Sequence, residues 1–480
     1  MAIKAGQIIH AGNGTVVVDR IQSGGPGQLN IPTEKIYELG NYQTVGTVRD
    51  VPDLSFSLES YDVSTEVETL LAGAADPRSV SDAGITAAGT TLTSATAAFT
   101  AADVGAQVVI GGAGTAGADF VTTIDSVTSA TEVEVTDAAV TTVSGETLDI
   151  APTIDLATAV PIDIVSQFKA GVSATDPTLV IGSVAVPYLY VESMSYRFGI
   201  RDNATQTASL RGDTVFYNPA GCFVETAAGT NTPNQDVVTT NDALQVAGGD
   251  QRRVLAVTVG SDRLTFGADY SESYGAITNG AAQTTVTIFD AVPTDQTIRI
   301  IYSSPATVQY ADTVHPSTTV KPAAVKGKDV EIYVGGYDPN DPTGSLANKL
   351  SSVQSVQIDW RVTIEKDEEL GNAYAVGQDF DVPEVSGSVD VKPRNPAEFL
   401  ELVRKVQGVA DAEKVLGTES STPLAMDVVI KHPDTDEVLK RIHVPDARFT
   451  PPGYTGRVQT KLTVTLPFES DEGGMEITPK

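Results

Sequence analysis

The sequence predicts a mainly β protein in which one strand-rich domain with a single helix occurs twice, accompanied by two small all-β modules. Three observations carry this prediction. Short runs alternate between apolar and polar residues and are separated by Gly, Asp, Asn and Pro, as half-buried strands are. Helical spacing is rare along the 480 residues. A segment near residue 38 recurs near residue 369.

Composition restricts the class of protein. A content of 41% hydrophobic and 19% charged residues is typical of a folded chain, and 480 residues exceed one ordinary domain. The 62 Asp and Glu against 31 Lys and Arg give a net charge of −31. Nucleic-acid backbones and anionic membrane surfaces are bound by Lys and Arg, so we expect neither as a bound partner.

The N-terminal sequence Met1 to Gln7 lacks the apolar core of a signal peptide, and no stretch approaches the ~20 apolar residues of a membrane span. We therefore expect synthesis in the cytoplasm and no membrane partner. Cys222 is the single cysteine, which excludes an intrachain disulfide and a thiolate metal cluster. We interpret it as a small apolar residue.

Three segments alternate most clearly: Leu54 to Leu58, Ser355 to Ile364, and Lys461 to Leu466. Strands of this length are typical of sandwiches and barrels. A helix is predicted from Pro396, with Asn395 as its N-cap and Glu398 bonding back to the cap. Gly408 is expected to end the helix. Its apolar stripe consists of Phe399, Leu400, Leu402, Val403 and Val406.

The internal repeat is the strongest signal in the sequence. An offset of 331 positions joins the two copies, and the segment from position 38 to 58 has 11 identities in 21 positions. Average residue usage would give on the order of one or two. The matched residues include Glu38, Leu39, Gly40, Asn41, Asp50 and Pro52, which recur as Glu369, Leu370, Gly371, Asn372, Asp381 and Pro383.

A weaker match continues the repeat, because Ser195 to Phe198 resembles Asp446 to Phe449. We therefore predict that residues 1–76 with 151–215 form the first copy and that 326–480 form the second. Residues 77–150 are rich in Ala, Thr, Gly and Val and carry no Lys or Arg after Arg78, which predicts an inserted small β module, Ig-like or similar. Residues 216–325 are predicted to form a second β module and a linker.

No motif predicts catalysis or a cofactor. Three glycines between Gly112 and Gly117 fit a dinucleotide pattern, but a strand follows them where a helix is needed, so a hairpin loop is the better interpretation. The four histidines lack the spacing of a zinc site. Asp338 and Asp341 on one short loop are a weak candidate for calcium, which prefers oxygen ligands.

The repeat and the helix together resemble features of a known family. The segments Glu369 to Asn372 and Val382 to Val389, the helix from Pro396, and Ala447 to Gly456 resemble the tail tube (major tail) proteins of tailed viruses. Residues 91–150 look like small β units of phage tails and fibres. The resemblance covers both copies, roughly 60% of the chain.

The resemblance implies a β-sandwich or half-barrel tube domain with one flanking helix, which forms six-fold rings that stack into a hollow tube. Two domains per chain would make the ring a homotrimer with pseudo-six-fold symmetry. The implied location is the virion. The implied partners are further copies of the chain and other tail proteins, such as the tape measure, terminator and baseplate components. Viral DNA would pass through the lumen without specific binding.

Several expectations follow. Acidic groups lining the lumen would repel DNA phosphates. The two modules would project outside the tube. Ring-to-ring contacts are expected around Glu38 to Asp53 and Glu369 to Glu384. Scarce Lys and abundant Asp also fit a protein of a high-salt host, where screening weakens surface repulsion.

Two other classes stay open. A modular β surface protein, of the adhesin or S-layer type, fits the acidic and Thr-rich composition, although the missing signal peptide argues against it. A glycoside-active enzyme would need two carboxylates across a cleft and several aromatic residues, whereas aromatics are 6% and Trp360 is the single Trp.

Overall fold

The computed structural model describes most of the chain. The described residues are 5–11, 16–17, 21–27, 29–30, 33–37, 44–49, 52–61, 65–72, 78–156, 161–170, 180–213, 215–218, 221–246, 252–260, 262–294, 296–305, 325–341, 343–367, 377–394, 396–407, 423–450, 453–455, 463–470 and 474–479. Strands dominate and both α-helices are short, which confirms the predicted mainly β fold.

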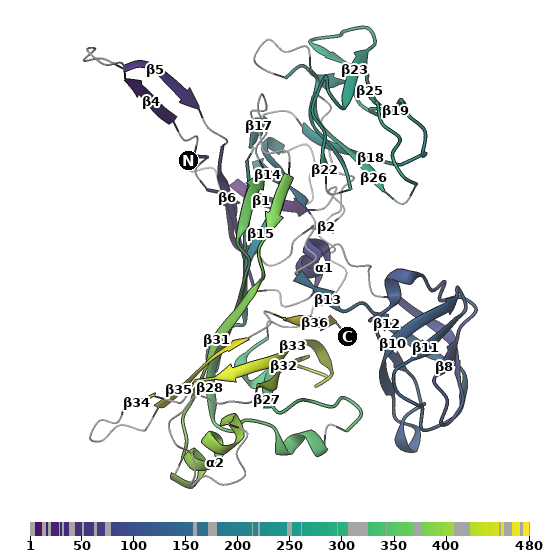
Figure 1. Ribbon diagram of the computed structural model, residues 1–480, viewed down its shortest axis with the longest axis vertical. Coiled ribbons are helices and arrows are strands. Elements are labelled where there is room, and N and C mark those ends of the chain that lie inside the picture. The colour runs from purple at the N-terminus through teal and green to yellow at the C-terminus, as the bar shows by residue number, and fades with distance from the viewer. Residues whose placement is uncertain are drawn as a thin grey trace.

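Eight antiparallel strands form one continuous layer, which runs through the centre of Figure 1. Their order is β3 (Ile21–Pro26), β6 (Leu54–Ser60), β16 (Thr205–Gly212), β15 (Val180–Gly199), β28 (Val353–Arg361), β31 (Glu384–Val391), β35 (Thr463–Ser470) and β34 (Gly453–Thr455).

Further strands pack behind this layer and enclose the main core. One group surrounds the first part of β15: β1 (Ala5–Ala11), β2 (Val16–Val17), β14 (Ile162–Ala170) and β17 (Phe216–Asn218). The other group surrounds β33 (Val438–Phe449): β27 (Val330–Val334), β32 (Leu424–Lys431), β36 (Glu476–Pro479) and β13 (Ile154–Asp155). The long strands β15 and β33 belong to both layers, so one core fills the space between them.

Alternation explains why these segments are strands. On β6, Leu54, Phe56 and Leu58 are buried, while Ser55 and Ser57 between them are exposed. Successive side chains of a strand point to opposite faces, so this pattern places one face on the core and the other in solvent.

Two helices accompany the sheet, α1 (Glu66–Ala72) and α2 (Pro396–Gln407). The start of α2 confirms the prediction from Pro396. Glu398 does reach back along the chain, but it accepts the N–H of Arg394 at 2.6 Å, one residue before the expected cap. Asn395 and Gly408 lie outside the described residues.

The same order of elements occurs on both sides of the β15–β28 contact. The hairpin β4 (Thr33–Tyr37) and β5 (Thr44–Arg49) matches the hairpin β29 (Ile364–Asp367) and β30 (Gly377–Phe380). Thr33 pairs with Arg49, and Ile364 pairs with Phe380, each residue shifted by 331. We call β1, β3–β6, α1 and β14–β17 the first set, and β27–β36 with α2 the second set.

The strand registers correct the weaker sequence match. Val191 pairs with Leu210 as Phe449 pairs with Phe468, so the residue equivalent to Phe449 is Val191 and not Phe198. A register shift follows each of these pairs, between Val191 and Ser193 in the first set and before Gly453 in the second. Short alternating runs resemble one another at several offsets, and only the pairing fixes the offset here at 258.

The module after α1 is a closed barrel of six strands with its own core, rather than an Ig-like sandwich. Its strands are β7 (Arg78–Ile85), β8 (Thr91–Thr93), β9 (Gln107–Ile110), β10 (Phe120–Ser129), β11 (Glu132–Val135) and β12 (Val143–Ala151). The glycines of the dinucleotide-like motif join β9 to β10, and a short 3-10 turn (Thr115–Gly117) lies among them. Another such turn is Ala101–Asp103.

The other module has two main sheets and a third core. Its strands are β18 (Gly221–Ala228), β19 (Gln235–Val238), β20 (Ala243–Leu244), β21 (Val254–Val259), β22 (Asp262–Arg263), β23 (Tyr270–Tyr274), β24 (Ala281–Ala282), β25 (Thr284–Ile288) and β26 (Thr297–Ser304). In Figure 1 both modules and α1 lie to the right of the central strands. Two 3-10 turns, Gly327–Asp329 and Gly344–Ala347, flank β27.

Candidate assembly interface

The contact between the two sets is an antiparallel pairing of β15 with β28. Met194 lies opposite Trp360, and Tyr196 lies opposite Ile358. All four side chains are buried on the core face. On the opposite face Ser195 Oγ donates to Asp359 Oδ1 at 2.5 Å. The sheet therefore continues across the junction without a break in its core.

The hairpin β29–β30 of the second set forms hydrogen bonds to the first set. Lys366 on β29 donates to the carbonyl of Pro52 at 2.7 Å and to Asp53 Oδ1 at 2.9 Å. Arg211 Nε donates to the same carboxylate oxygen at 2.8 Å. Partial burial alone would raise the pKa of Asp53, but the hydrogen bonds from Arg211 and Lys366 lower it below the usual value. We call this contact the clasp.

An aromatic contact supports the clasp from the same face of the hairpin. Phe380 on β30 lies 5.2 Å from the ring of Tyr190, measured between ring centroids. Tyr190 in turn meets Tyr188 edge-on at 5.3 Å. The hairpin is thus fixed by one cation and one ring, both on side chains that cross from the second set to the first.

A buried ion pair ties α1 to the second set. Lys440 on β33 forms a salt bridge with Glu68 Oε1, and both side chains have no exposed surface. Tyr196 OH donates to the same oxygen at 2.8 Å. Burial, with the neighbouring Glu68 carboxylate, raises the pKa of Tyr196 well above its usual value. Glu68 Oε2 has no hydrogen-bond partner among the described residues.

The outer edges of the eight-strand layer are β3 at one end and β34 at the other. Among the described residues neither strand pairs on its outer side. Because Gly27 N–H donates inward to Ser55 O at 2.6 Å, the adjacent Pro26 turns its nitrogen to the open edge. Proline without an N–H is typical of edge strands, where it limits unwanted pairing.

The exposed face of this layer is rich in hydroxyl groups. Its carboxylates are outnumbered by Ser and Thr, and some are bonded within the face: Asp390 accepts from Ser355 Oγ and Thr465 Oγ1, each at 2.7 Å. The face-lining residues include Ser55, Ser57, Glu59, Ser193, Ser195, Arg197, Thr205, Thr207, Ser209, Arg211, Ser355, Gln357, Asp359, Arg361, Glu384, Ser386, Ser388, Asp390, Thr463, Thr465 and Glu469. The face is therefore polar, with no aromatic residue among those named here and with more hydroxyl groups than carboxylates.

The loop with Asp338 and Asp341 holds the barrel in place. Asn340 accepts the N–H of Val121 on β10 at 2.7 Å and donates to the Val121 carbonyl at 2.6 Å. Asp338 Oδ1 accepts the N–H of Asn340, and Asp341 Oδ1 accepts the N–H of Gly344. Within the described part of the chain no three His, Cys, Asp or Glu residues lie close enough to hold a metal ion.

The second module is docked on the first set by ion pairs. Arg299 on β26 bonds to Asp163 on β14, and Arg263 Nη1 lies 2.9 Å from Asp213 Oδ1. Burial raises the pKa of Asp163, although Arg299 acts against this rise. A small apolar cluster of Ala185, Ala256 and Ile301 completes the contact.

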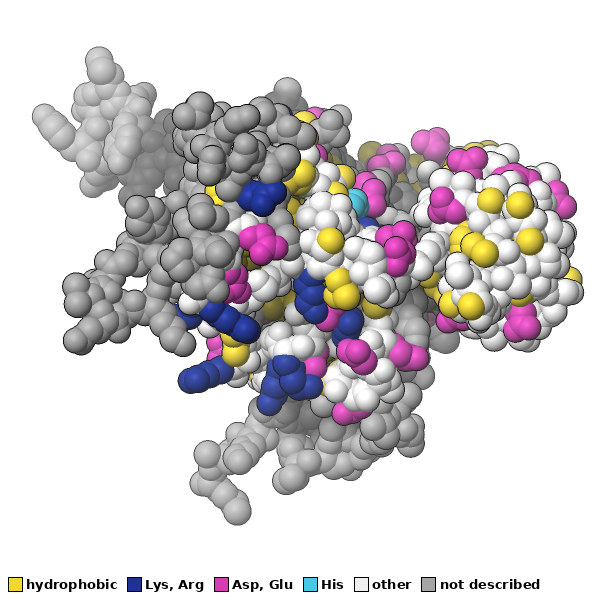
Figure 2. Space-filling view, turned by 90° about the horizontal axis from the view of Figure 1, so that it is seen from below, with side chains coloured by type: hydrophobic (Ala, Val, Ile, Leu, Met, Phe, Trp, Pro, Cys, Tyr) yellow, Lys and Arg dark blue, Asp and Glu magenta, His cyan; other side chains and the backbone are white. Residues whose placement is uncertain are grey.

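Figure 2 shows a further difference between the barrel and the rest of the chain. The barrel lobe, at the right of the view, presents acidic and apolar side chains and no Lys or Arg toward the viewer. Arg78 is the single basic residue among residues 78–151, against nine Asp and Glu. Arg78 is bound to Asp103 at 2.8 Å, so the barrel surface carries a strong net negative charge.

The assembly residues expected from the repeat fall into two groups. Pro52 lies in the clasp, between the two sets of one chain. Its equivalent Pro383, with Asp381, lies on an exposed turn beside Val382, whose surface is 70% exposed. The clasp residue Lys366 has no signal of its own in the sequence and was missed. The other residues, Glu38, Leu39, Gly40, Asn41, Asp50, Glu369, Leu370, Gly371 and Asn372, lie outside the described residues.

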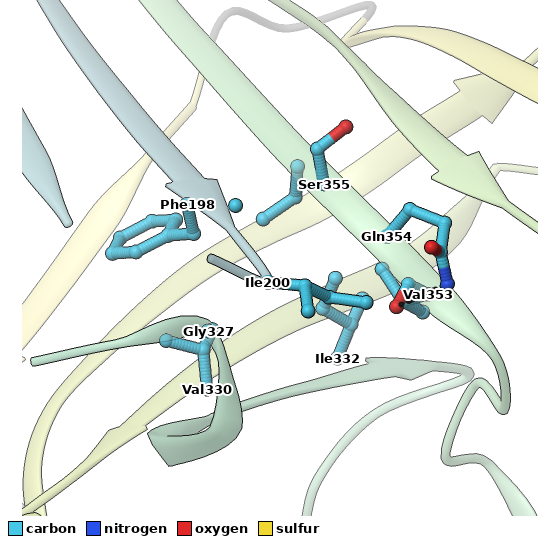
Figure 3. Close-up of a pocket in the computed structure, with 10 residues that line it drawn as sticks. Phe198, Ile200, Gly327, Val330, Ile332, Val353, Gln354 and Ser355 are labelled. Atoms are coloured by element: carbon cyan, nitrogen blue, oxygen red, sulfur yellow. Dashed lines mark hydrogen bonds between the residues drawn. The ribbon is translucent and has the colours of Figure 1, made fainter. Parts of the chain in front are cut away.

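A pocket at the lower end of the β15–β28 junction has a volume of about 60 Å³. Phe198, Ile200, Ile332 and Val353 line it, as Figure 3 shows. Ligand sites for small molecules usually measure ~300–1,000 Å³, so this space is a packing gap at the junction.

Comparisons with known proteins give no family. No protein-family model and no curated protein matches the sequence. Neither helix in the described ranges is long and apolar enough to span a bilayer.

Proposed function

We propose that the chain is a tail tube protein of a tailed virus, in which two copies of one domain assemble side by side into a ring and the rings stack into a hollow tube. The observation that carries the proposal is the head-to-tail pairing of β15 with β28. Within the chain an edge strand of the first set, β15, pairs with an edge strand of the second set, β28. The equivalent strands β34 of one chain and β3 of the next chain can repeat this contact. Repetition of a head-to-tail contact produces a closed ring when the rotation closes.

The register of the proposed contact follows from the internal one. Arg197 pairs with Gln357, and their equivalents are Thr455 and Gly25, because Gly25 pairs with Ser57 as Gln357 pairs with Ser388. Tyr196 pairs with Ile358, and their equivalents are Tyr454 and Pro26. Since Pro26 lacks an N–H, this pair would keep one hydrogen bond at most, which makes the contact between chains weaker than the contact within a chain. The chain therefore folds before it assembles.

Three chains with two domains each would complete a ring with six domain positions. The polar, hydroxyl-rich face would line the lumen, because α1 and both modules lie on the other side of the layer (Figure 1). DNA would meet few exposed cations there and would pass without being held. The modules would decorate the outside, the virion would be the location, and other tail proteins would be the partners. The alternative, a modular β surface protein, would leave both edges unpaired.

A cysteine pair tests the ring directly. Gly25 has no atom within 4 Å of the position where a Cβ would stand, so Gly25→Cys is tolerated. In the variant Cys222→Ser, Gly25→Cys, Thr455→Cys, oxidation should join chains into covalent closed rings, seen as discrete bands without reductant. Each single cysteine in the Cys222→Ser background is the control and should give dimers at most. Negative-stain microscopy of the wild-type chain should show hollow rings. A monomer that forms neither rings nor crosslinks would overturn the proposal.

A further inference from the structure

The turn that is equivalent to Pro52 and Asp53 in the second set is not clasped by a lysine of the described chain. Lys366 grips Pro52 and Asp53 within one chain. Shifted by 331 positions, the clasping residue becomes Lys35 on β4, and the gripped residues become Pro383 and Glu384. The lysine and the proline are conserved in type between the two positions, and the carboxylate changes only from Asp to Glu.

We infer that Lys35 of one chain clasps the Pro383–Glu384 turn of a neighbouring copy of the chain. The inference rests on the proposed ring, in which the first set of one chain follows the second set of the one before it. In that arrangement the hairpin β4–β5 stands toward the neighbour as β29–β30 stands toward the first set. The ammonium group of Lys35 then donates to the Pro383 carbonyl and to the Glu384 carboxylate.

The receiving turn is exposed in a single chain, and the strand that carries Lys35 belongs to a separate two-stranded sheet. Figure 1 shows the hairpin β4–β5 projecting away from the body of the protein. The Glu384 side chain is 69% exposed, and Val382 beside it is 70% exposed. Arg361 Nη2 contacts Glu384 Oε2 at 2.5 Å, and in the described part of the chain this surface pair is the only hydrogen bond or ion pair of the Glu384 carboxylate.

The residues around the internal clasp and the proposed clasp between chains differ, and this difference favours each hairpin for its own receiving turn. The position of Arg211 in the internal clasp is taken by Glu469, so Lys35 would meet two carboxylates where Lys366 meets one. The Phe380–Tyr190 ring contact is not repeated, because Arg49 and Arg448 stand at these positions. Each hairpin is thus matched to its own receiving turn, and exchanging them would place Arg49 against an aromatic ring and leave Phe380 without one.

Charge reversal tests the clasp. Lys35→Glu and Glu384→Lys should each raise about tenfold the protein concentration at which half of the chains are in rings, since each removes a charge-assisted hydrogen bond and adds a repulsion. The double variant Lys35→Glu, Glu384→Lys should recover most of the assembly. Lys328→Glu, which changes the charge equally at an exposed lysine, should leave assembly unchanged. Sedimentation velocity measures the assembled fraction, and circular dichroism checks folding.

Running the same variants in the Cys222→Ser, Gly25→Cys, Thr455→Cys background separates the clasp from the ring. If the parent variant crosslinks and both single charge variants assemble as well as the parent does, the clasp is overturned and the ring proposal stands. Absence of crosslinks and rings in the parent would overturn both. If Lys35→Glu fails to fold, Glu384→Lys and Lys35→Ala decide the question by the same readouts.

Discussion

Glu68 and Lys440 stand 372 positions apart in sequence and form a salt bridge with both side chains fully buried. Glu68 lies on α1 and Lys440 on β33, so the pair joins the first set to the second through the core. Their equivalents across the repeat are Phe399 and Gly182, which cannot form an ion pair. The pair is therefore specific to the junction within the chain.

We expect Lys440→Met to destabilise the chain by about 3–5 kcal/mol, because it leaves the Glu68 charge buried without its cation. The double variant Glu68→Met, Lys440→Met removes both charges and should recover most of this loss. Urea unfolding followed by tryptophan fluorescence measures both, since Trp360 lies in the same core. A single variant as stable as the wild type would contradict the assignment of a charged pair.

Glu331 makes stability depend on acid pH. Hydrogen bonds from Lys349, Tyr333 and Lys431 outweigh its partial burial and lower its pKa from 4.5 to about 2. A lowered carboxyl pKa contributes stability that is present above the unfolded pKa and is lost as pH falls through the folded pKa. We expect the wild type to lose stability between pH 4.5 and 2 through this group.

The full shift corresponds to roughly 3 kcal/mol, and solvent screening at this partly exposed site reduces our expectation to about 1–2 kcal/mol. Glu331→Gln should lower stability by that amount at pH 7 and flatten the slope between pH 4.5 and 2. Urea midpoints across this range measure the effect. Glu365→Gln, for which no such ion pair is described, is the control, and an equal change of slope in both variants would contradict the prediction.

Gly387 is required by close packing on β31. A Cβ at this position would lie 2.3 Å from the carbonyl oxygen of Gln357 and 2.5 Å from the ring of Phe468. Gly387→Ala should therefore destabilise the chain by about 1–3 kcal/mol. Ser386→Ala, on the exposed face of the same strand, should change stability by less than about 0.5 kcal/mol. Equal thermal melting of the two variants would show that the strands move apart without cost.

Asn340 holds the barrel by its two hydrogen bonds to the backbone of Val121. Asn340→Ala should speed hydrogen exchange of the Val121 amide by roughly fivefold, because one hydrogen bond contributes about 1 kcal/mol. Asn340→Asp keeps the acceptor oxygen but sets a second carboxylate oxygen against the Val121 carbonyl in place of the donor, so it should retain only part of the protection. Exchange measured by mass spectrometry on peptides of β10 reads this out, while unaltered exchange in Asn340→Ala would mean that the barrel is held elsewhere.

Alternation and repetition determined much of this protein from sequence alone. The buried and exposed faces of β6 follow from Leu54, Phe56 and Leu58, since the side-chain period of a strand is two. The start of α2 follows from Pro396. The repeat at offset 331 made the segments around Glu38 to Asp53 and Glu369 to Glu384 equivalent, but the hairpins that these segments belong to were not predicted.

The tertiary structure decided what joins distant segments. The clasp of Lys366 on Asp53 and the burial of Lys440 against Glu68 join residues 313 and 372 positions apart. The equivalence of Val191 and Phe449 follows from the pairing of β15 with β16 and of β33 with β35. A local pattern records which face of a strand is apolar but not which strand lies beside it. Partners are selected by the folded core as a whole, and only the tertiary structure shows that β3 and β34 end the eight-strand layer.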